Sequence, residues 1–203
     1  MIMRKAKIKK VERYLFWHCK HKYEAGLAVS SILGVLIDLK PACNCIFDEQ
    51  KTRKFSLRRF AAILEELELK VIFERKIIEG GYLLSLYISK SQKKAERLKE
   101  LFGDLNRYNF GDKVRKGINE EIGKLLGYPK TAVDYYVRNV ESGDLSKSHK
   151  DRILRYFYYA HSDKYQDQEF KEYDIVLNRA LEKYSSRSAK EIRRKYPQKR
   201  WLD

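Results

Sequence analysis

Residues 69–89, LKVIFERKIIEGGYLLSLYIS, contain the pattern that decides the fold. Two runs rich in β-branched, aromatic and other apolar residues, 69–78 and 82–89, flank Glu79, Gly80 and Gly81. A Gly-Gly step between two such runs is a strong indication of a β-hairpin, because glycine adopts the positive φ values of tight hairpin turns. The segment therefore predicts two strands joined by a turn.

The sequence around the hairpin predicts an α+β fold for residues 1–105. A short apolar run at 42–47 predicts a further strand, so we expect a small antiparallel sheet. Ser56 is expected to cap a helix and Gly103 to end one. Helices are expected to cover one face of the sheet. Apolar residues at helical spacing predict these helices at 5–21, 23–39, 57–67 and 91–102.

From residue 106 onward the pattern is wholly helical, so 106–203 is expected to form a second, helical domain. Asp112 is expected to open a helix, and Pro129 is tolerated at a helix start because its missing N–H needs no partner there. A loop is expected at 141–144. The helices of this half are predicted at 112–126, 129–140, 148–160, 167–184 and from 186 to about 197.

Composition excludes several classes of protein. No apolar run reaches the roughly 18 residues that a membrane-spanning helix needs. Three cysteines are too few, and odd in number, for a disulfide scaffold, so a reducing cytoplasm is expected. No phosphate-binding glycine loop, dinucleotide-binding glycine motif or serine nucleophile motif is present, and no cofactor is expected.

The formal net charge of +16 is concentrated in three segments. Residues 1–22 carry a net charge of +7, residues 51–59 carry +5 and residues 185–203 carry +5. The remainder of the chain is therefore close to neutral. Clustered Lys and Arg are typical of a surface that binds a polyanion. The alternative is that charged ends only keep the protein soluble.

Residues 121–137 resemble a helix-turn-helix. Gly123 is a small residue where the two helices would cross, and Gly127 accepts the positive φ that the turn needs. If this corner reads DNA, the second helix presents Lys130, Thr131 and Arg138 to the major groove. The alternative is a tight helical corner with a purely structural role.

The same stretch has a second resemblance. Leu126-Gly127-Tyr128-Pro129, followed by Val133 and an aromatic residue at 136, is similar to an uncharacterised prokaryotic family with a Leu-Gly-Tyr-Pro-x-Cys-Cys-Val motif. Thr131 and Ala132 stand here where that family has its paired cysteines. The likeness extends over about 110–184 and implies no particular activity.

A metal site is an alternative in the N-terminal half. Cysteine and histidine are the usual zinc ligands, and strand alternation allows both cysteines of a Cys-x-Cys to point to the same side. The order of elements in 23–103 also resembles a LAGLIDADG-type homing endonuclease module, which implies a metal-dependent nuclease, but Lys40 stands where that motif has its metal-binding acid. The candidate ligands for the zinc site are His18, Cys19, His21, Cys43 and Cys45.

We therefore predict a non-catalytic protein that binds DNA or RNA. The alternatives are an assembly factor that docks an acidic protein partner and, third, the metal-dependent enzyme. Tyr196 and Trp201 in the basic tail are expected to offer platforms for unpaired bases. The phosphate contacts are assigned to Arg4, Lys5, Lys7, Lys9, Lys10, Lys51, Arg53, Lys54, Arg58, Arg59, Arg193, Arg194, Lys195, Lys199 and Arg200.

Overall fold

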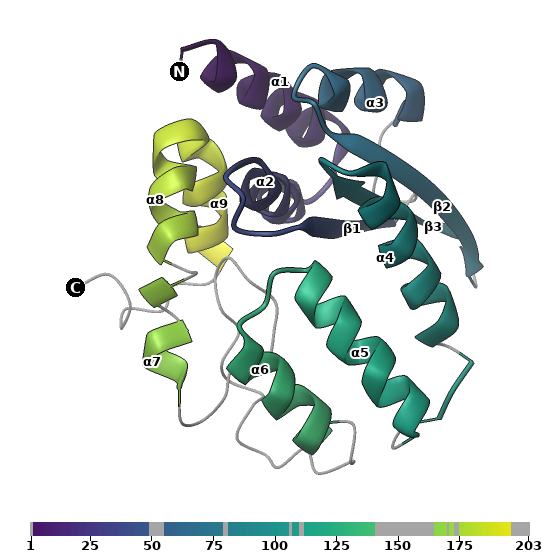
Figure 1. The fold of residues 1–203 in the computed structure, drawn as a ribbon. Helices are drawn as coiled ribbons and strands as arrows, with labels where there is room; N and C mark the ends of the chain where they lie inside the picture. The colour runs from purple at the N-terminus through teal and green to yellow at the C-terminus, as the bar shows by residue number, and fades with distance from the viewer. Residues whose placement is uncertain are drawn as a thin grey trace.

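A small sheet with helices on both sides forms the centre of the computed structural model (Figure 1). The structure describes residues 2–48, 55–78, 81–105, 107–109, 112–140, 165–169, 171–172 and 175–195. The loop predicted at 141–144 and the helix predicted at 148–160 lie outside the described residues.

The sheet has three antiparallel strands, in the order β1-β3-β2. Its register places Leu86 of the central strand between Cys45 and Phe73. The predicted hairpin and the predicted further strand are both confirmed. The strands are β1 (Ala42–Asp48), β2 (Lys70–Ile78) and β3 (Gly81–Ser89).

The helices of the N-terminal half lie close to their predicted positions. Ser56 caps α3 as predicted, because its side-chain oxygen accepts a hydrogen bond from the Arg59 N–H. The prediction that Gly103 ends a helix is wrong: α4 continues through it for two more residues, and its Cβ position is open space, so nothing there requires glycine. The helices are α1 (Ile2–His18), α2 (Lys22–Leu36), α3 (Leu57–Glu65) and α4 (Gln92–Leu105).

In the described part of the C-terminal half, helices are joined by short turns, and no strand is present. Asp112 caps its first helix, accepting a hydrogen bond from the Val114 N–H at 2.7 Å. The helix expected at 129–140 changes from α to π geometry at Tyr136. The elements are α5 (Lys113–Leu125), α6 (Lys130–Tyr135), the π-helix η2 (Tyr136–Val140), α7 (Gln166–Glu169), α8 (Ile175–Tyr184) and α9 (Ser186–Lys195).

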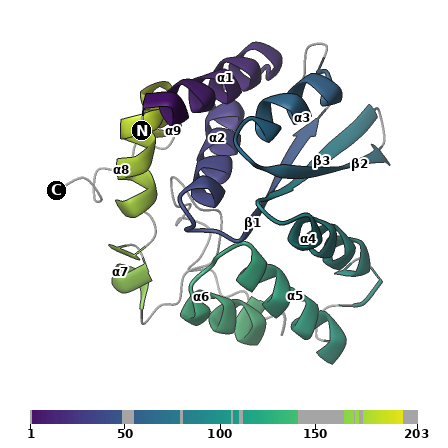
Figure 2. The ribbon, with the colours of Figure 1, turned by 45° about the horizontal axis from the view of Figure 1, so that its top comes forward.

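The main hydrophobic core lies on the sheet face that carries Cys45 and Leu86. Strand residues alternate between faces, and on this face they meet the apolar sides of α2 and α3. Helix α1 lies across both of these helices (Figure 2). The face contributes Cys43, Cys45, Phe47, Leu84, Leu86 and Ile88 to the core.

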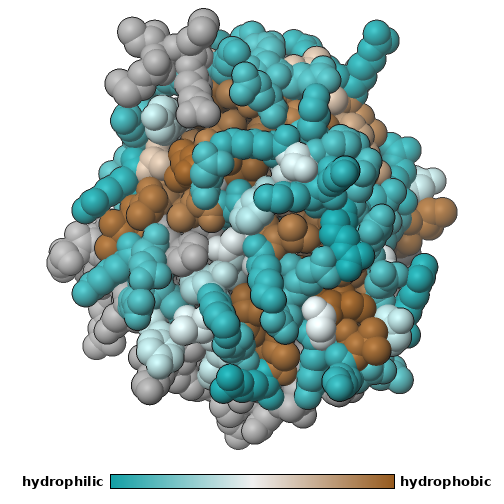
Figure 3. Space-filling model, in the orientation of Figure 1, coloured by the Kyte–Doolittle hydropathy of each residue, from teal (hydrophilic) through white to brown (hydrophobic). Residues whose placement is uncertain are grey.

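Helices also cover the opposite face, so the prediction of helices on one face only is wrong. Tyr87 of β3 is buried there against Leu98 and Leu101 of α4, with Ile122 of α5 behind them. The prediction failed because β3 is apolar at successive positions, a pattern of strands buried on both faces rather than one. Hydrophilic side chains cover most of the described surface in the view of Figure 3.

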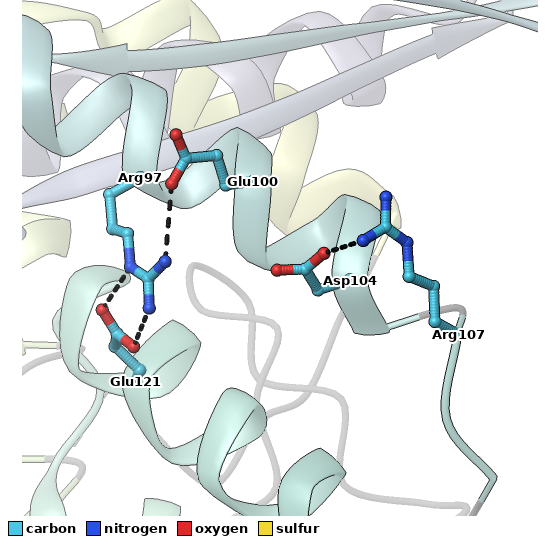
Figure 4. Close-up of polar contacts among 5 residues, drawn as sticks. All are labelled: Arg97, Glu100, Asp104, Arg107 and Glu121. Atoms are coloured by element: carbon cyan, nitrogen blue, oxygen red, sulfur yellow. Dashed lines mark hydrogen bonds and ion pairs between the residues drawn. The ribbon is translucent and has the colours of Figure 1, made fainter.

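An ion-pair cluster fixes α5 against α4. The Arg97 guanidinium donates two hydrogen bonds of 2.7 Å to the two carboxylate oxygens of Glu121 and one of 3.4 Å to Glu100 (Figure 4). The bidentate geometry orients both side chains. Hydrogen bonding from Arg97 holds the pKa of Glu121 below its ordinary value.

Helices α8 and α9 share the main core with α1 and α2. Leu177, Leu181 and Ile192 are fully buried in it. A Cβ built on Gly26 of α2 would lie 3.2 Å from Ile192 Cγ1, so the two backbones approach closely. The division into domains 1–105 and 106–203 stays a prediction, but the chain returns to its first core after residue 175. Within the described residues, none of the helices combines the length and apolar character that crossing a membrane requires.

Candidate functional site

Helices α1 and α3 bring parts of the first two basic segments together. The link is Tyr14, whose hydroxyl donates to the Ser56 carbonyl oxygen and accepts from the Ser56 N–H, both at 2.8 Å. Burial raises the pKa of Tyr14, so the hydroxyl keeps the proton that it donates. Because Ser56 also caps α3, this contact fixes the start of α3 against the middle of α1.

A groove of about 820 Å³ runs between these two helices. Its apolar lining includes Tyr14, which is 6% exposed, and two residues of α3, Ala62 and Ile63. Trp17 belongs to the same lining but is 76% exposed. The full lining is Lys10, Arg13, Tyr14, Trp17, His18, Arg59, Ala62, Ile63 and Glu66.

The charged groups of the groove differ in how they are paired. Glu66 forms an ion pair with Lys10 at 2.7 Å, and its backbone carbonyl accepts a hydrogen bond from Lys7 Nζ at 2.6 Å. Within the described residues, no carboxylate forms an ion pair with the guanidinium of Arg13 or Arg59. The groove therefore has a neutralised end at Glu66 and two guanidinium groups that no carboxylate of the described residues neutralises.

Stacked rings lie beside the groove. The His18 ring centroid is 4.2 Å from that of Tyr14, and the ring centroids of Phe55 and Phe60 each lie 5.2 Å from it. Such contacts limit ring movement, because each ring is held by neighbours on more than one side. Tyr14 and His18, the two members of this cluster that line the groove, are thus held in place by their neighbours.

The exposed side of α1 extends the positive charge beyond the groove. Lys9, Arg13 and Trp17 follow one another at intervals of four residues and are all exposed. Residues at that spacing are neighbours on one helix face. Lys5 at the start of α1 and Arg58 beside Arg59 are exposed as well.

The third basic segment meets α1 on its other side, through α9. Glu12 of α1 accepts hydrogen bonds from the Ser185 and Ser188 hydroxyls and, at 3.0 Å, from the Ser188 N–H. A buried carboxylate is stabilised at this point because the N-terminus of a helix carries partial positive charge. The Arg187 guanidinium lies 4.2 Å from the centroid of the Phe16 ring.

The predicted cations of α9 are engaged within the fold. Arg193 contacts the Glu182 carboxylate and the Asn178 side chain, and Arg194 pairs with Glu191 at 3.0 Å. Lys195 Nζ lies 5.3 Å from the centroid of the Tyr23 ring. The structure thus places α9 beside α1, but it uses these side chains for internal contacts.

The α5–α6 corner has the backbone geometry that its glycines predict. Gly127 has φ +72°, and a Cβ there would lie 2.7 Å from the Leu39 carbonyl oxygen. A Cβ on Gly123 would lie 2.6 Å from Val133 Cγ2, so the two helices cross closely at this point. The Tyr128 N–H donates to the Gly123 carbonyl and the Gly127 N–H to the Lys124 carbonyl, which together form a Schellman helix end.

The polar side chains of α6 already have partners inside the protein. Lys130 pairs with Asp134 one turn along the helix. The Thr131 hydroxyl donates a hydrogen bond to the carboxylate of Glu169, which is 1% exposed. Arg138 is exposed. Of the three residues expected to contact bases, Thr131 is held in a buried contact with α7.

The cysteine and histidine candidates do not gather around one point. Cys19, Cys43 and Cys45 are buried, and the two strand cysteines face the main core. His18 belongs to the aromatic cluster, and the His21 ring lies 6.0 Å from that of Tyr23. Within the described part of the chain, no three side chains of the His, Cys, Asp and Glu types are placed to hold a metal ion.

Several predicted contacts cannot be placed. The side chain of Arg4 and the aromatic residues Tyr196 and Trp201 lie outside the described residues. The basic residues outside them are Lys51, Arg53, Lys54, Lys199 and Arg200.

Sequence reasoning missed two central residues of the groove, Arg13 and Trp17. The signal was present, since they are four residues apart and therefore adjacent on one helix face. Within residues 1–22, the predicted phosphate contacts end at Lys10 and therefore leave both residues out.

Compared with models of known protein families, with curated proteins and with solved structures, the chain shows no significant match.

Proposed function

We propose that the protein binds nucleic acid through the α1–α3 groove and the exposed side of α1. The observation that carries the proposal is the pair of guanidinium groups of Arg13 and Arg59, which have no carboxylate partner within the described residues and lie beside the exposed Trp17. Arginine suits this task because its planar fork donates paired hydrogen bonds to phosphate oxygens.

The charge distribution supports a polyanionic ligand. Residues 1–22 carry a net charge of +7, and this segment supplies both the groove wall and the exposed lysines of α1. Each phosphate that such a surface neutralises releases condensed counterions, so affinity falls steeply as salt rises. The lone carboxylate of the groove lining, Glu66, is already paired with Lys10 and leaves the Arg13–Arg59 part positive.

A base-reading role for the α5–α6 corner is a finer and separate proposal. The internal contacts of Lys130 and Thr131 argue against it, because a base contact would have to break them. If the corner reads sequence, Thr131→Ala or Arg138→Ala alters which sequences bind. If it only supports the fold, Thr131→Ala lowers stability and leaves the sequence preference unchanged.

The test is a binding titration with duplex DNA, single-stranded DNA and structured RNA at several salt concentrations. We expect tight binding, with the logarithm of the association constant falling linearly with the logarithm of the salt concentration. The Arg13→Ala/Arg59→Ala double variant should reduce the magnitude of that slope by roughly 1 to 2, because two phosphate contacts are lost.

The matched control is Lys93→Ala/Lys94→Ala on α4, which removes the same charge from the far side of the sheet. This control variant should change the slope of log affinity against log salt much less than the Arg13→Ala/Arg59→Ala variant does. Equal effects of the two double variants would show that binding follows net charge and not the groove. No binding to any nucleic acid near physiological salt would overturn the proposal and favour an acidic protein partner.

A further inference from the structure

We infer that the ligand of the α1–α3 groove is a single-stranded nucleic acid, with one unpaired base stacked on the indole of Trp17. The inference rests on the proposed function and specifies its substrate class. Its test therefore separates failure of the stacking contact from failure of nucleic-acid binding as such.

The exposure of Trp17 is the first observation. Its side chain is 76% exposed, although its neighbours along the chain, Phe16 and His18, both pack against other rings or cations. Within the described residues, the indole makes no ring contact with another aromatic side chain. A large aromatic surface is thus available to a ligand at the edge of the groove.

The position of the guanidinium groups is the second observation. Arg13 lies one helical turn before Trp17, where Cβ atoms are about 5–6 Å apart, and Arg59 lines the groove from α3. A phosphate held by either arginine leaves its attached base within reach of the indole. Aromatic platforms beside positive charge are the usual arrangement for binding unpaired strands.

The accessibility of bases selects between single and double strands. In a duplex, each base face is covered by the next base pair, so an aromatic side chain can stack only on an unpaired or unstacked base. Phosphate contacts alone would not distinguish the two forms. Trp17 therefore adds affinity for single strands that a duplex cannot gain.

The groove lining also indicates how the strand lies and what it reads. Ala62 and Ile63 offer apolar surface with no hydrogen-bonding side-chain groups, and the lining contains no Asn or Gln to read base edges. Stacking is tolerant of sequence because every base has a π-face. At the other end Lys10 is already paired with Glu66, so the backbone should follow Arg13 and Arg59 with little sequence preference.

The experiment uses the full chain with Trp201→Phe, which leaves Trp17 as the sole tryptophan of the two. An oligothymidylate of roughly 12 nucleotides, a length that spans typical single-strand sites, is titrated in and compared with its duplex. We expect quenching of Trp17 fluorescence by the single strand and little quenching by the duplex. Anisotropy of a labelled oligonucleotide reports binding independently of the indole.

Trp17→Ala should weaken single-strand binding by about 5- to 150-fold, the range for loss of one base–aromatic stack, and Trp17→Phe should weaken it less. Tyr108→Ala, which removes another exposed aromatic ring between α4 and α5, is the matched control and should have no effect. Circular dichroism checks that each variant remains folded, as expected for an exposed position.

Two results would distinguish failure of the stacking inference from failure of the proposed function. Duplex bound as tightly as single strand, with unchanged Trp17 fluorescence and unchanged affinity in Trp17→Ala, would overturn the stacking inference and leave the proposed function standing. Absence of binding to either oligonucleotide by anisotropy would overturn both.

Discussion

The α1–α3 groove and the α5–α6 corner are both surface features built on helices that carry basic residues, yet they differ in what their side chains are doing. In the groove, Arg13 and Arg59 have no carboxylate partner within the described residues, and Trp17 is 76% exposed. In the corner, Lys130 pairs with Asp134, and Thr131 is bonded to buried Glu169.

The difference shows that a plausible binding motif also needs side chains that are not already bonded inside the protein. Gly123 and Gly127 allow a close helix crossing and a positive φ in the corner, but Gly127 packs on backbone atoms of Leu39 and Lys40. The groove matches no named motif, yet it presents unneutralised charge and an open aromatic ring. This contrast is the reason that we propose the groove as the binding site and expect the corner to contribute to stability.

The largest expected effect is on stability at the corner. Gly127→Ala should lower the free energy of unfolding by about 3 kcal/mol, because alanine is strained at positive φ and its Cβ would meet backbone atoms of Leu39 and Lys40. Chemical denaturation measures this. Gly117→Ala is the control: its Cβ meets nothing within 4 Å, so a helical alanine should stabilise by about 0.5–1 kcal/mol. A cost below about 1 kcal/mol at Gly127 would contradict the structural role.

The free energy of unfolding should fall at alkaline pH because Cys19 is buried in the main core. Burial raises the pKa of Cys19 from 9.0 to about 12, so the folded state keeps a proton that the unfolded state loses. The contribution of Cys19 to the free energy of unfolding is therefore fully present below pH 9. It falls as the pH rises, by about 2 kcal/mol at pH 10.5. Denaturation at a series of pH values measures the fall, and Cys19→Ala should flatten it. An unchanged pH dependence in that variant would contradict the assignment.

Charge removal should separate the two regions in binding assays. Arg13→Ala/Arg59→Ala should weaken single-stranded DNA binding by about 100-fold, since each of the two charge-assisted hydrogen bonds contributes about 1.5 kcal/mol. Lys130→Ala/Arg138→Ala removes the same charge from α6 and η2 and should weaken this binding less than about threefold. A larger loss of affinity in the Lys130→Ala/Arg138→Ala variant would indicate that the strand binds at the corner instead.

The smallest expected effect comes from the neutralised end of the groove. Glu66→Gln removes the carboxylate that pairs with Lys10, whose side chain is half exposed, and should raise affinity by about two- to fivefold. Anisotropy titration at low salt measures the gain, and high salt should abolish it. Weaker binding in this variant would show that Glu66 contributes to the site by a direct contact.

Local patterns in the sequence predicted local structure well. The hairpin, the caps at Ser56 and Asp112, and the two glycine roles in the corner all depend on residues within a few positions of one another. Periodicity also located most described helix cores. The α+β class followed from these elements without long-range information.

The groove required contacts that no local pattern contains. Tyr14 and Ser56 are 42 residues apart in sequence, and their hydrogen bonds place α1 against α3. The contact between Glu12 and Ser188 spans 176 residues and brings α9 to α1. Glu169, which accepts the hydrogen bond of Thr131, lies 38 residues further along the chain. The sequence alone therefore could not show that the Thr131 hydroxyl is already hydrogen-bonded.

The most direct test of the central claim locates a bound strand by cross-linking. A single-stranded oligonucleotide containing 5-bromodeoxyuridine is bound to the full chain and irradiated, and the cross-linked peptides are identified by mass spectrometry. The account predicts adducts within α1, foremost at Trp17. Adducts confined to α6 and η2, with none in α1 or α3, would contradict it.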